Sequence, residues 1–471
     1  MSTVRIETLG CRLNQIESEA AANLFINQGF DVKMEGVTAS SQSDDLTFLV
    51  IINTCAVTKK AEQKARRLIR LILKKYKNAV LLVTGCYAQL SKNEIEKIDR
   101  RIVVLGGQVK SRLSKVPQIL KEFSSKEFDC DGFIKQIKND VISLPVIKPD
   151  FPEDSFKLST TTMLAHSRAS LKVQDGCNNS CSYCTIHIAR GHSVSLDVKT
   201  AVERVCSLEK QGYDEVVLTS INIAQYKGLY ENENGQQYLN FAQLLEKLIA
   251  STQKINFRIS SLYPEIVDQN FCRVIADKRV RPHFHISVQS GSDKILALMN
   301  RVYKSEQVLQ ACEKIREVKP DAFIACDIIT GFPGETSQDF EQTMELCERC
   351  NFTWIHAFPF SERPGTPACS MKNKVPQSES QKRAKRLTQW AIKQKIKYIE
   401  QFAGKELTAV VEKKVSEQEN LYHCMTENFI HCQLVSKNPL IINKEIKIRI
   451  TGPLKEKITK GGEIEAEAQA L

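Results

Sequence analysis

The sequence predicts an α/β protein in three parts: an N-terminal parallel α/β domain, a central partial (β/α)6 barrel and a small C-terminal antiparallel β-barrel. Short apolar runs alternate with amphipathic stretches near the N-terminus, and a second such series occupies the middle of the 471 residues. This alternation is typical of parallel sheets with helical crossovers, and the alternating apolar and polar residues of the tail are typical of a small barrel. We expect domains at residues 1–135, 166–400 and 401–471, with a linker at 136–165.

The composition is that of a globular protein without a membrane segment. Hydrophobic residues make up 42% of the chain and charged residues 26%, which are ordinary values. No apolar run reaches the roughly 18 residues that a membrane span needs, and the N-terminus lacks the layout of a secretory signal. We therefore expect a cytoplasmic protein whose 16 cysteines stay reduced. The net charge of +11 indicates a polyanionic partner.

The N-terminal series has a cysteine at the end of each of its first three predicted strands. The runs and their last residues are 4–11 with Cys11, 48–55 with Cys55, and 79–86 with Cys86. A fourth apolar run covers 101–107. The carboxyl ends of parallel strands share one edge of a sheet, where ligands usually bind. We therefore expect the three cysteines to converge in space.

The middle series consists of six apolar runs with amphipathic stretches between them. In a (β/α) barrel the chemistry lies at the carboxyl ends of the strands, and three further cysteines follow the first run directly. A basic helical stretch at 380–402 then leads to the barrel-like tail. The six runs are 171–176, 215–220, 257–261, 283–289, 323–331 and 354–360.

The cysteines after the first run are spaced Cys177-x3-Cys181-x2-Cys184. Three thiolates can hold a four-iron cluster and leave one iron free for another ligand. A structural zinc site instead needs four protein ligands. His187 and His192 are near enough in sequence to supply the fourth, so a Cys3His zinc site is the alternative.

Tyr183 stands immediately before the last of these cysteines, and the motif resembles the signature of radical S-adenosylmethionine (SAM) enzymes. The resemblance implies that the free iron of a [4Fe-4S] cluster binds SAM and that an electron from the cluster cleaves it to a 5′-deoxyadenosyl radical. The cofactor then carries the hard chemistry and the protein supplies binding and orientation. By the same resemblance, Tyr183 lies near the adenine of SAM.

The segments around Cys11, Cys55 and Cys86, together with 283–301, 327–340 and 358–368, resemble the methylthiotransferase family. The resemblance implies a second [4Fe-4S] cluster on these three cysteines and an RNA-binding TRAM domain in the tail. The N-terminal motifs are most similar to the branch that modifies N6-threonylcarbamoyladenosine 37 beside the tRNA anticodon, although Arg12-Leu13 stands where that branch usually has Lys-Val. The alternatives are the branches that act on isopentenyladenosine or on an aspartate of a ribosomal protein.

The resemblance also implies how the reaction is divided. One SAM supplies the radical that removes hydrogen from C2 of the adenine, the N-terminal cluster presents a sulfur, and a second SAM supplies the methyl group. The aromatic C–H bond has no acidic proton, so we expect no catalytic acid or base. The implied partners are the tRNA anticodon loop, an electron donor such as flavodoxin or ferredoxin, and a sulfur source. The target base must leave its stack to be reached, which a loop permits more cheaply than a duplex.

Residues at the ends of two barrel strands are candidates for contact with SAM. Ser220 and Asn222 follow the second strand, and Gln289 and Ser290 end the fourth. For Ser220 and Asn222 the alternative is a satisfied turn without a ligand, whereas Gln289 and Ser290 could face the ribose or the reaction cavity. The turn Gly331–Glu335 can approach a ligand through its glycines, or it can simply shape the chain.

A basic helix at 59–77 carries nine Lys or Arg and one acidic residue. So dense a charge of one sign favours contact with tRNA phosphates, through Lys64, Arg66, Arg67 and Arg70; the alternative is a solvated face. Cys347-x2-Cys350 has no partner pair and favours a packing role. A reading from a different class is a zinc-stabilised RNA-binding protein without catalysis.

Overall fold

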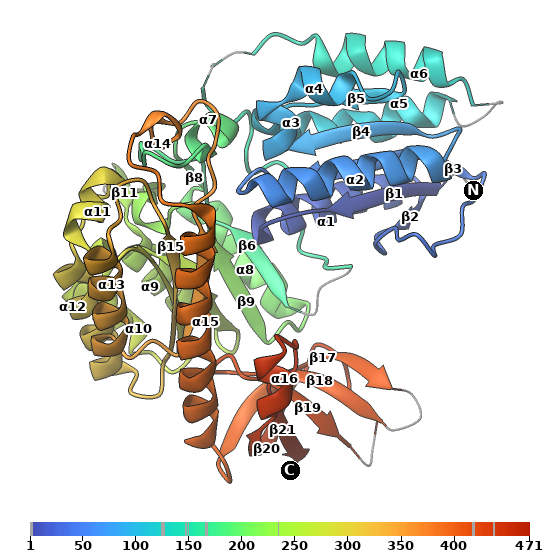
Figure 1. Cartoon of the computed structure of the whole chain (residues 1–471). Coiled ribbons are helices and arrows are strands. Elements are labelled where there is room, and N and C mark those ends of the chain that lie inside the picture. The colour runs from blue at the N-terminus through green and yellow to red at the C-terminus, as the bar shows by residue number, and fades with distance from the viewer. Residues whose placement is uncertain are drawn as a thin grey trace. The chain divides into compact units, whose positions relative to one another are not determined.

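The computed structural model describes residues 3–123, 128–146, 148, 150–164, 168–233, 235–416, 420–436 and 439–471. The chain forms two compact units (Figure 1). The first unit comprises residues 1–165, 172–196 and 361–366, and the second comprises 166–171, 197–360 and 367–471. Within the described ranges, no helix combines the length and the apolar character needed to cross a membrane.

The first unit is built on a parallel sheet with the strand order β2-β1-β3-β4-β5. The four predicted strands are confirmed, and β2 is an additional short edge strand. The strands are β1 (Thr3–Thr8), β2 (Asp31–Lys33), β3 (Thr47–Thr54), β4 (Val80–Gly85) and β5 (Ile102–Val104). The central strands are apolar on both faces because helices cover both sides of the sheet.

Alternate residues of β3 separate the two cores of this unit. Leu49 and Ile51 pack with the helices on one face, and Val50 and Ile52 pack with those on the other. The first face is covered by α1 (Arg12–Ile26), η1 (Gly107–Lys115), α5 (Val116–Phe123), α6 (Cys130–Ile137) and the π-helical turn η2 (Lys138–Ile142). The second face is covered by α2 (Lys59–Lys75), α3 (Cys86–Leu90) and α4 (Lys92–Glu96).

Part of the predicted linker belongs to the core of the first unit. Ile137, Val141 and Leu158 are buried in the cluster that packs against α1. The apolar residues of this segment form only short runs that polar residues interrupt, so the sequence pattern predicts a linker. The predicted domain boundaries stay a prediction. By their contacts, residues 172–196 belong to the first unit.

The second unit contains five of the six predicted barrel strands and the beginning of the first, whose predicted run 171–176 passes into the first unit at residue 172. They lie in two sheets with the orders β12-β9-β6 and β13-β14-β15-β16. The third predicted strand is divided at Ser260 into two short strands, one in each sheet. The strands are β6 (Ala169–Lys172), β9 (Glu215–Thr219), β12 (Asn256–Ile259), β13 (Ser261–Leu262), β14 (His283–Gln289), β15 (Phe323–Thr330) and β16 (Trp354–Pro359).

Helices connect these strands, as the alternation of the sequence predicts. The connecting helices are α8 (Val198–Lys210), α9 (Phe241–Ser251), α10 (Gln269–Ile275), α11 (Asp293–Leu298), α12 (Ser305–Val318) and α13 (Ser337–Arg349), and α14 (Pro367–Ser370) follows the last strand. Short turns η3 (Ile223–Gln225) and η4 (Pro264–Ile266) and a hairpin of β10 (Gly228–Asn232) and β11 (Gly235–Leu239) lie between them.

Buried ion pairs join the amino-terminal ends of the barrel strands to the C-terminal barrel. The carboxylate of Glu215 accepts from Arg258 Nε at 2.8 Å and from Arg281 Nε at 3.0 Å. Burial opposes the charge of Glu215, but these arginines and Arg168 lower its pKa to about 2. Arg258 also donates to the backbone carbonyl of Thr426, the last residue of β18 (Leu421–Thr426). A buried carboxylate of this kind needs its partners, because an unpaired buried charge is costly.

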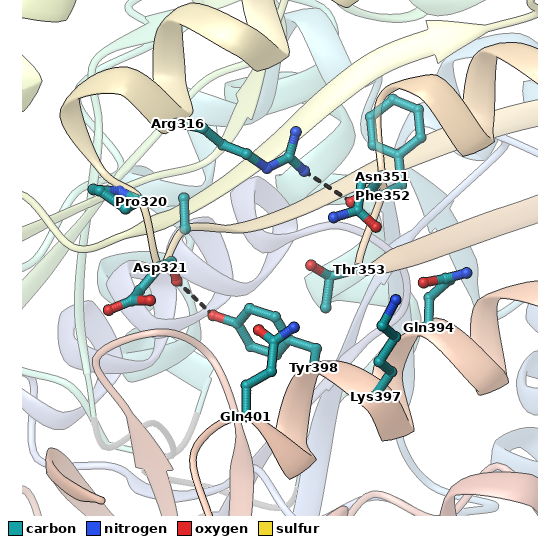
Figure 2. A pocket seen from close by; sticks show the side chains of 11 residues that line it. Arg316, Pro320, Asp321, Asn351, Phe352, Thr353, Gln394, Lys397, Tyr398 and Gln401 are labelled. Carbon is teal, nitrogen blue, oxygen red and sulfur yellow. Dashed lines mark hydrogen bonds between the residues drawn. The ribbon is translucent and has the colours of Figure 1, made fainter.

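The long helix α15 (Gln377–Glu400) leads into the C-terminal barrel and lines a small polar pocket of about 70 Å³ (Figure 2). Arg316 donates to the carbonyl of Asn351, and the hydroxyl of Tyr398 donates to the carbonyl of Asp321 across this pocket. None of the predicted site residues lines it. The pocket therefore plays no part in the site described below.

The tail closes into a five-stranded barrel with the order β17-β18-β19-β21-β20. The predicted barrel is confirmed, and all its pairs are antiparallel except β19 with β21. The strands are β17 (Glu406–Ser416), β18 (Leu421–Thr426), β19 (His431–Val435), β20 (Glu445–Pro453) and β21 (Ala466–Ala470), and α16 (Lys455–Thr459) precedes the last one. Closure leaves no free sheet edge, which suits a small module.

Candidate radical SAM site and second cysteine cluster

Cys11, Cys55 and Cys86 lie at the carboxyl ends of three neighbouring strands, as the sequence predicts. Cys11 follows β1 and precedes α1, Cys55 follows β3, and Cys86 begins α3 directly after β4. Strand order places β3 between β1 and β4, so the three residues share one edge of the sheet. Burial raises the pKa of the Cys55 thiol, and the neighbouring Cys86 and Cys11 raise it further, which agrees with their closeness.

Two glycines allow the chain to approach these cysteines closely. Gly10 has a φ of +103°, and a Cβ on it would lie 2.8 Å from the sulfur of Cys55. Gly85 has a φ of +97°, and a Cβ on it would lie 2.2 Å from the carbonyl oxygen of Thr54. Only glycine tolerates both the backbone conformation and the approach. The loops at this edge are therefore built to bring the cysteines together.

The donor set fits an iron–sulfur cluster better than a single zinc ion. Burial raises the pKa of Cys55 to about 11, so this thiol would stay protonated without a bound cation. Zinc with bonds of about 2.3 Å would hold three sulfurs about 4 Å apart. Among the described residues, neither cysteine trio has its three sulfurs within 4.8 Å of one another. A four-iron cluster spreads its thiolate ligands over different irons and therefore needs a wider spacing.

Cys177, Cys181 and Cys184 lie in the loop between β7 (Gln174–Asp175) and α7 (Ile186–Arg190). The backbone amide of Asn179 donates to the sulfur of Cys177 at 3.4 Å, and that of Ile186 donates to the sulfur of Cys184 at 3.4 Å. Hydrogen bonds to the sulfurs stabilise thiolates and tune the cluster that they hold. This loop is thus suited to three cysteine ligands.

Over the residues that the structure describes, the histidines considered as a fourth zinc ligand do not form a compact group with these sulfurs. The ring of His192 packs on Phe151 with centroids 4.9 Å apart, and its Nδ1 lies 3.1 Å from the side-chain oxygen of Asn178. In the described part of the chain, no histidine joins the cysteines in a group compact enough for one ion. The strand β8 (Val194–Ser195) pairs with β7 and closes the loop. The geometry therefore gives the zinc alternative no support.

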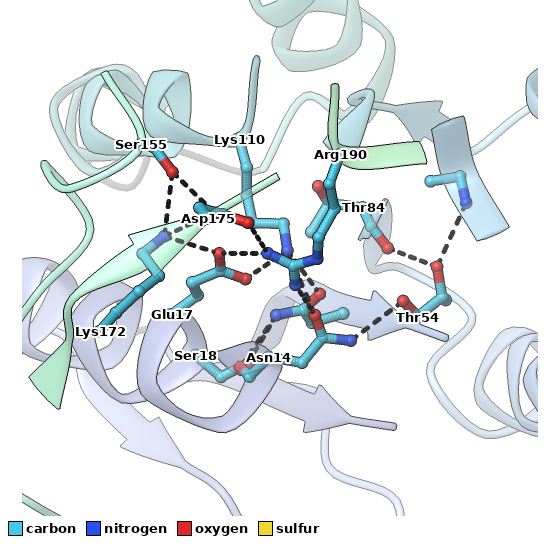
Figure 3. A network of polar contacts seen from close by, with 12 residues as sticks. Asn14, Glu17, Ser18, Thr54, Thr84, Lys110, Ser155, Lys172, Asp175 and Arg190 are labelled. Atoms are coloured by element: carbon cyan, nitrogen blue, oxygen red, sulfur yellow. Dashed lines mark hydrogen bonds and ion pairs between the residues drawn. The ribbon is translucent and has the colours of Figure 1, made fainter. Parts of the chain in front are cut away.

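A buried network of charges ties the cysteine loop to the helix that follows Cys11 (Figure 3). Glu17 on α1 accepts from Lys110 at 2.5 Å and from Lys172 at 3.0 Å. Asp175 accepts from Lys172 at 3.0 Å and from Arg190 at 2.9 Å. All five side chains are at most 5% exposed. Pairing of this kind is what makes buried charges tolerable.

This network also sets the charge beside Cys11, Cys55 and Cys86. Burial alone would raise the pKa of Glu17, but Lys110, Lys172 and Arg190 hold it well below its usual range. Burial also raises the pKa of the Cys86 thiol, and Arg190 and Lys110 oppose that rise. Arg190 therefore provides positive charge where thiolates have to form. No local sequence signal identifies this network, because its members are far apart in the chain.

The predicted SAM contacts differ in how they are placed. Ser220 is buried and its hydroxyl has no hydrogen-bond partner in the described part of the chain, as expected of a group that awaits a ligand. Gln289 has a φ of +70°, a strained conformation that is common at ligand sites. Asn222 accepts from the amide of Ala224 and caps η3. Ser290 is fully buried and its hydroxyl accepts from the amide of Ser292, so it shapes the turn. Tyr183 is half-buried in the cysteine loop.

The turn Gly331–Glu335 is held by α15. The carboxylate of Glu335 accepts from the amide of Gly331 at 2.6 Å and from Arg383 at 2.5 Å. A Cβ on Gly331 would lie 1.7 Å from the hydroxyl of Ser380. Packing against the helix explains why this position is glycine, and it favours the turn-shaping role.

The basic residues of α2 fall into two groups. Lys64, Arg67 and Arg70 are exposed. Arg66 differs from them, because it donates to the hydroxyl of Tyr87 at 2.9 Å and pairs with Glu94 at 3.6 Å. We therefore assign Arg66 to the packing of the unit rather than to the exposed basic face.

Four further cysteines gather in the second unit. Cys312 interacts with Cys350, and Cys326 interacts with Cys347. All four are fully buried, and burial raises the pKa of Cys312 and Cys326 well above the usual value. These cysteines pack as small apolar side chains, as predicted for the Cys347–Cys350 pair.

Two family models match the chain: the radical SAM superfamily over residues 171–347 and the uncharacterized protein family UPF0004 over residues 3–107. The structure of the radical SAM methyltransferase TsrM from Kitasatospora setae has a similar fold, with a TM-score of 0.53, 14% identity, and coverage of 78% of this chain and 75% of that chain. Together with the cysteine loop, these matches define a radical SAM enzyme, with [4Fe-4S] clusters and SAM as its cofactors.

Similar sequences show to which family of radical SAM enzymes the chain belongs. The chain is 40% identical to the threonylcarbamoyladenosine tRNA methylthiotransferase MtaB of Treponema pallidum, over 96% of this chain and 98% of the relative. It is 30% identical to the tRNA-2-methylthio-N(6)-dimethylallyladenosine synthase of Wolbachia pipientis, over 89% of this chain and 90% of the relative. The chain belongs to the family of threonylcarbamoyladenosine tRNA methylthiotransferases.

Proposed function

We propose that this enzyme inserts a methylthio group at C2 of N6-threonylcarbamoyladenosine 37 in tRNA, with SAM as both the radical source and the methyl donor. The relative with 40% identity carries this substrate in its name, whereas the relative named for dimethylallyladenosine is 30% identical. The observation that carries the proposal is the pair of cysteine trios in one compact unit, each with three ligands instead of four.

In this proposal Cys177, Cys181 and Cys184 hold the cluster that binds SAM, and Cys11, Cys55 and Cys86 hold the cluster that provides sulfur. The clusters and SAM, when bound, supply the radical, sulfur and methyl chemistry. The protein binds and orients these groups. The backbone amides of Asn179 and Ile186 favour the thiolate forms in the first trio, and Arg190 favours them in the second.

The SAM molecule would contact the residues at the ends of the barrel strands and in the cysteine loop. Ser220 offers an unpaired hydroxyl, and Gln289 projects from a strained backbone. We assign no acid or base to the removal of hydrogen, because the C2–H bond of adenine has no acidic proton. The proposed SAM contacts are Tyr183, Ser220, Asn222, Gln289 and Ser290.

The RNA partner would be held mainly through its phosphates. Lys64, Arg67 and Arg70 form an exposed basic face on α2, and the net charge of the chain is +11. Phosphate contacts position an RNA without reading its sequence. The C-terminal barrel would add contacts to the backbone. The electron donor would be a flavodoxin or a ferredoxin, a separate sulfur source would reload the second cluster, and the reduced thiols suit the cytoplasm.

The test is complementation of a bacterial strain that lacks its own enzyme for this modification, followed by mass spectrometry of tRNA nucleosides. The wild-type chain is expected to restore the methylthio group on threonylcarbamoyladenosine, and Cys11→Ala and Cys181→Ala are each expected to abolish it. Cys130→Ala is the matched control, since Cys130 lies in the same unit and its thiol donates only to the carbonyl of Asn78.

Each of the other outcomes of this experiment would support one of the alternative functions. A methylthio group on isopentenyladenosine would assign the chain to the other tRNA branch. No modification, from protein that is colourless and contains zinc, would support the non-catalytic RNA-binding reading. The proposed enzyme is instead brown when purified without oxygen and contains about eight iron atoms per chain.

A further inference from the structure

A second set of metal-type ligands lies in the C-terminal barrel, in the same unit as the barrel strands but outside both cysteine trios. Glu412 on β17, His423 on β18 and His431 on β19 each place one ligand atom within 4.8 Å of the other two. Over the described ranges, they are the one such group of His, Cys, Asp and Glu. Three strands of one small barrel therefore meet in this cluster.

Glu412 reaches the histidines from an irregularity in its strand. The pairing of β17 with β18 shifts between Val411 and Lys413, so Glu412 is the extra residue of a β-bulge. Bulges turn a side chain away from the regular alternation of the strand. One carboxylate oxygen of Glu412 thus lies 3.6 Å from Nδ1 of His423, although regular pairing places Lys413 opposite that residue.

Nδ1 of His423 is buried and has no hydrogen-bond partner among the described residues. The other nitrogen, Nε2, lies 3.1 Å from Nδ1 of His431, so one of the two imidazoles donates to the other. If His423 is the donor, its Nδ1 is a bare lone pair that faces a carboxylate. If His423 carries its proton on Nδ1, the 3.6 Å to Glu412 is too long for a hydrogen bond. In both tautomers the protein alone leaves a buried polar atom unsatisfied.

A cation between these groups removes the conflict. Zinc bonds to nitrogen and oxygen of about 2.0 to 2.1 Å in a tetrahedral site place neighbouring ligands about 3.4 Å apart. The 3.6 Å between Glu412 and Nδ1 of His423 is close to that value, and Glu412, His423 and His431 each offer one ligand atom within 4.8 Å of the other two. The second oxygen of Glu412 accepts from Arg168 at 2.9 Å, which orients the carboxylate as outer-shell partners do in metal sites.

The charges around the cluster are compatible with a divalent ion. Lys413 is paired with Glu463, and Arg168 is shared between Glu412 and Glu215. Lys395, which also acts on His431, is paired with Glu465. The neighbouring cations are thus compensated by carboxylates.

We propose that Glu412, His423 and His431 bind one divalent ion of the zinc type, which fastens β17, β18 and β19 together. Two imidazoles and a carboxylate leave a fourth position for water, and this donor set suits zinc and its neighbours among the transition metals. This site is independent of the proposed reaction, because none of its residues takes part in either cluster.

The experiment uses the full chain with both clusters in place, so that the six cluster cysteines are occupied. After incubation with zinc chloride and removal of free metal, elemental analysis is expected to give one zinc per chain. Glu412→Gln, His423→Gln and His431→Gln are each expected to lose that zinc and to keep the iron content of the wild type. Glu406→Gln is the matched control on β17, because Glu406 is exposed and pairs with Arg449. It is expected to keep the zinc.

Two further readouts separate this site from zinc bound by stray thiols. X-ray absorption at the zinc edge is expected to show only nitrogen and oxygen neighbours near 2.0 Å, while sulfur near 2.3 Å would overturn the proposal. Zinc is expected to raise the melting temperature of the wild type and of Glu406→Gln but not of the three ligand variants. Wild-type protein that gains no zinc, or variants with native iron content that keep it, would also overturn the proposal.

Discussion

The guanidinium of Arg190 lies 2.9 Å from the carboxylate of Asp175 in the buried network of the first unit. Asp175 stands two positions before Cys177, and Arg190 stands six positions after Cys184. The pair therefore closes the cysteine loop at its base. Arg190 also donates to the side-chain oxygen of Asn14 on α1 at 2.8 Å, so the same residue connects the loop to the helix that follows Cys11.

Replacement of Arg190 by Gln is expected to destabilise the first unit by about 3 to 5 kcal/mol, because it leaves Asp175 buried and short of a partner. Hydrogen exchange of the β3 amides in the full chain measures this change as local free energy of opening. Arg386→Gln is the matched control, since Arg386 pairs with Glu341 on the surface, where a pair contributes at most about 1 kcal/mol. Unchanged exchange in Arg190→Gln would contradict the role of the network.

The same network makes the stability of the first unit depend on pH in the acid range. The pKa of Glu17 is held well below the usual value of about 4.3, and that of Asp175 is also lowered. The stabilisation is therefore fully present above about pH 4.3 and is lost as the pH falls toward the folded pKa values. Hydrogen exchange of β3 from pH 7 to pH 3, corrected for the intrinsic rate, is expected to show protection that declines below about pH 4. In Glu17→Gln, the protection of β3 at pH 7 is expected to be lower than in the wild type and to decline less as the pH falls. An equal decline in the two proteins would assign the pH dependence to other groups.

Gly10→Ala is expected to remove the second cluster without removing the first. A Cβ on Gly10 would lie 2.5 Å from the Cβ of Cys55 and 2.8 Å from its sulfur, so one cysteine has to move. Iron analysis is expected to fall from about eight to about four atoms per chain. Gly29→Ala is the matched control, because Gly29 also has a positive φ of +87° but has no atom within 4 Å of the added Cβ. Full iron content in Gly10→Ala would show that the trio tolerates the displacement.

Neutralisation of Lys64, Arg67 and Arg70 is expected to weaken tRNA binding and to flatten its dependence on salt. Each lost phosphate contact lowers the slope of log affinity against log salt by about 0.7 to 0.9. Binding of tRNA to the triple Gln variant between 50 and 200 mM salt measures the change. Arg66→Gln is the internal control and is expected to leave the slope unaltered, because Arg66 is held by Tyr87 and Glu94. If the salt dependence flattened in Arg66→Gln and not in the triple variant, Arg66 would be the phosphate contact and the three exposed residues would not.

The sequence was sufficient to locate both cysteine trios, because their positions follow from local patterns. Buried strands such as β3 and β4 are continuous apolar runs, and each ends at a cysteine. The six barrel strands and the closed tail follow from the same periodicity. The division of one strand at Ser260 and the parallel pairing of β19 with β21 depend on tertiary packing, and no local pattern marks them.

The features that were not predicted depend on residues far apart in the chain. Glu17 pairs with Lys110 and Lys172, which are 93 and 155 positions away, and a charged residue in a helix normally indicates a solvated face. The contacts of Cys312 with Cys350 and of Cys326 with Cys347 also join residues that are distant in the sequence. The sequence does not show that Arg66 is held by a partner whereas Lys64 is exposed, because that partner, Tyr87, lies on another helix.

The most direct test of the account is the reaction of the purified full chain, reconstituted with iron and sulfide, with SAM, a reductant and tRNA that carries threonylcarbamoyladenosine. Mass spectrometry of the digested tRNA is predicted to show the nucleoside heavier by one methylthio group in place of one hydrogen. Threonylcarbamoyladenosine that stays unmodified, from protein with both clusters loaded and with SAM consumed, would contradict the account.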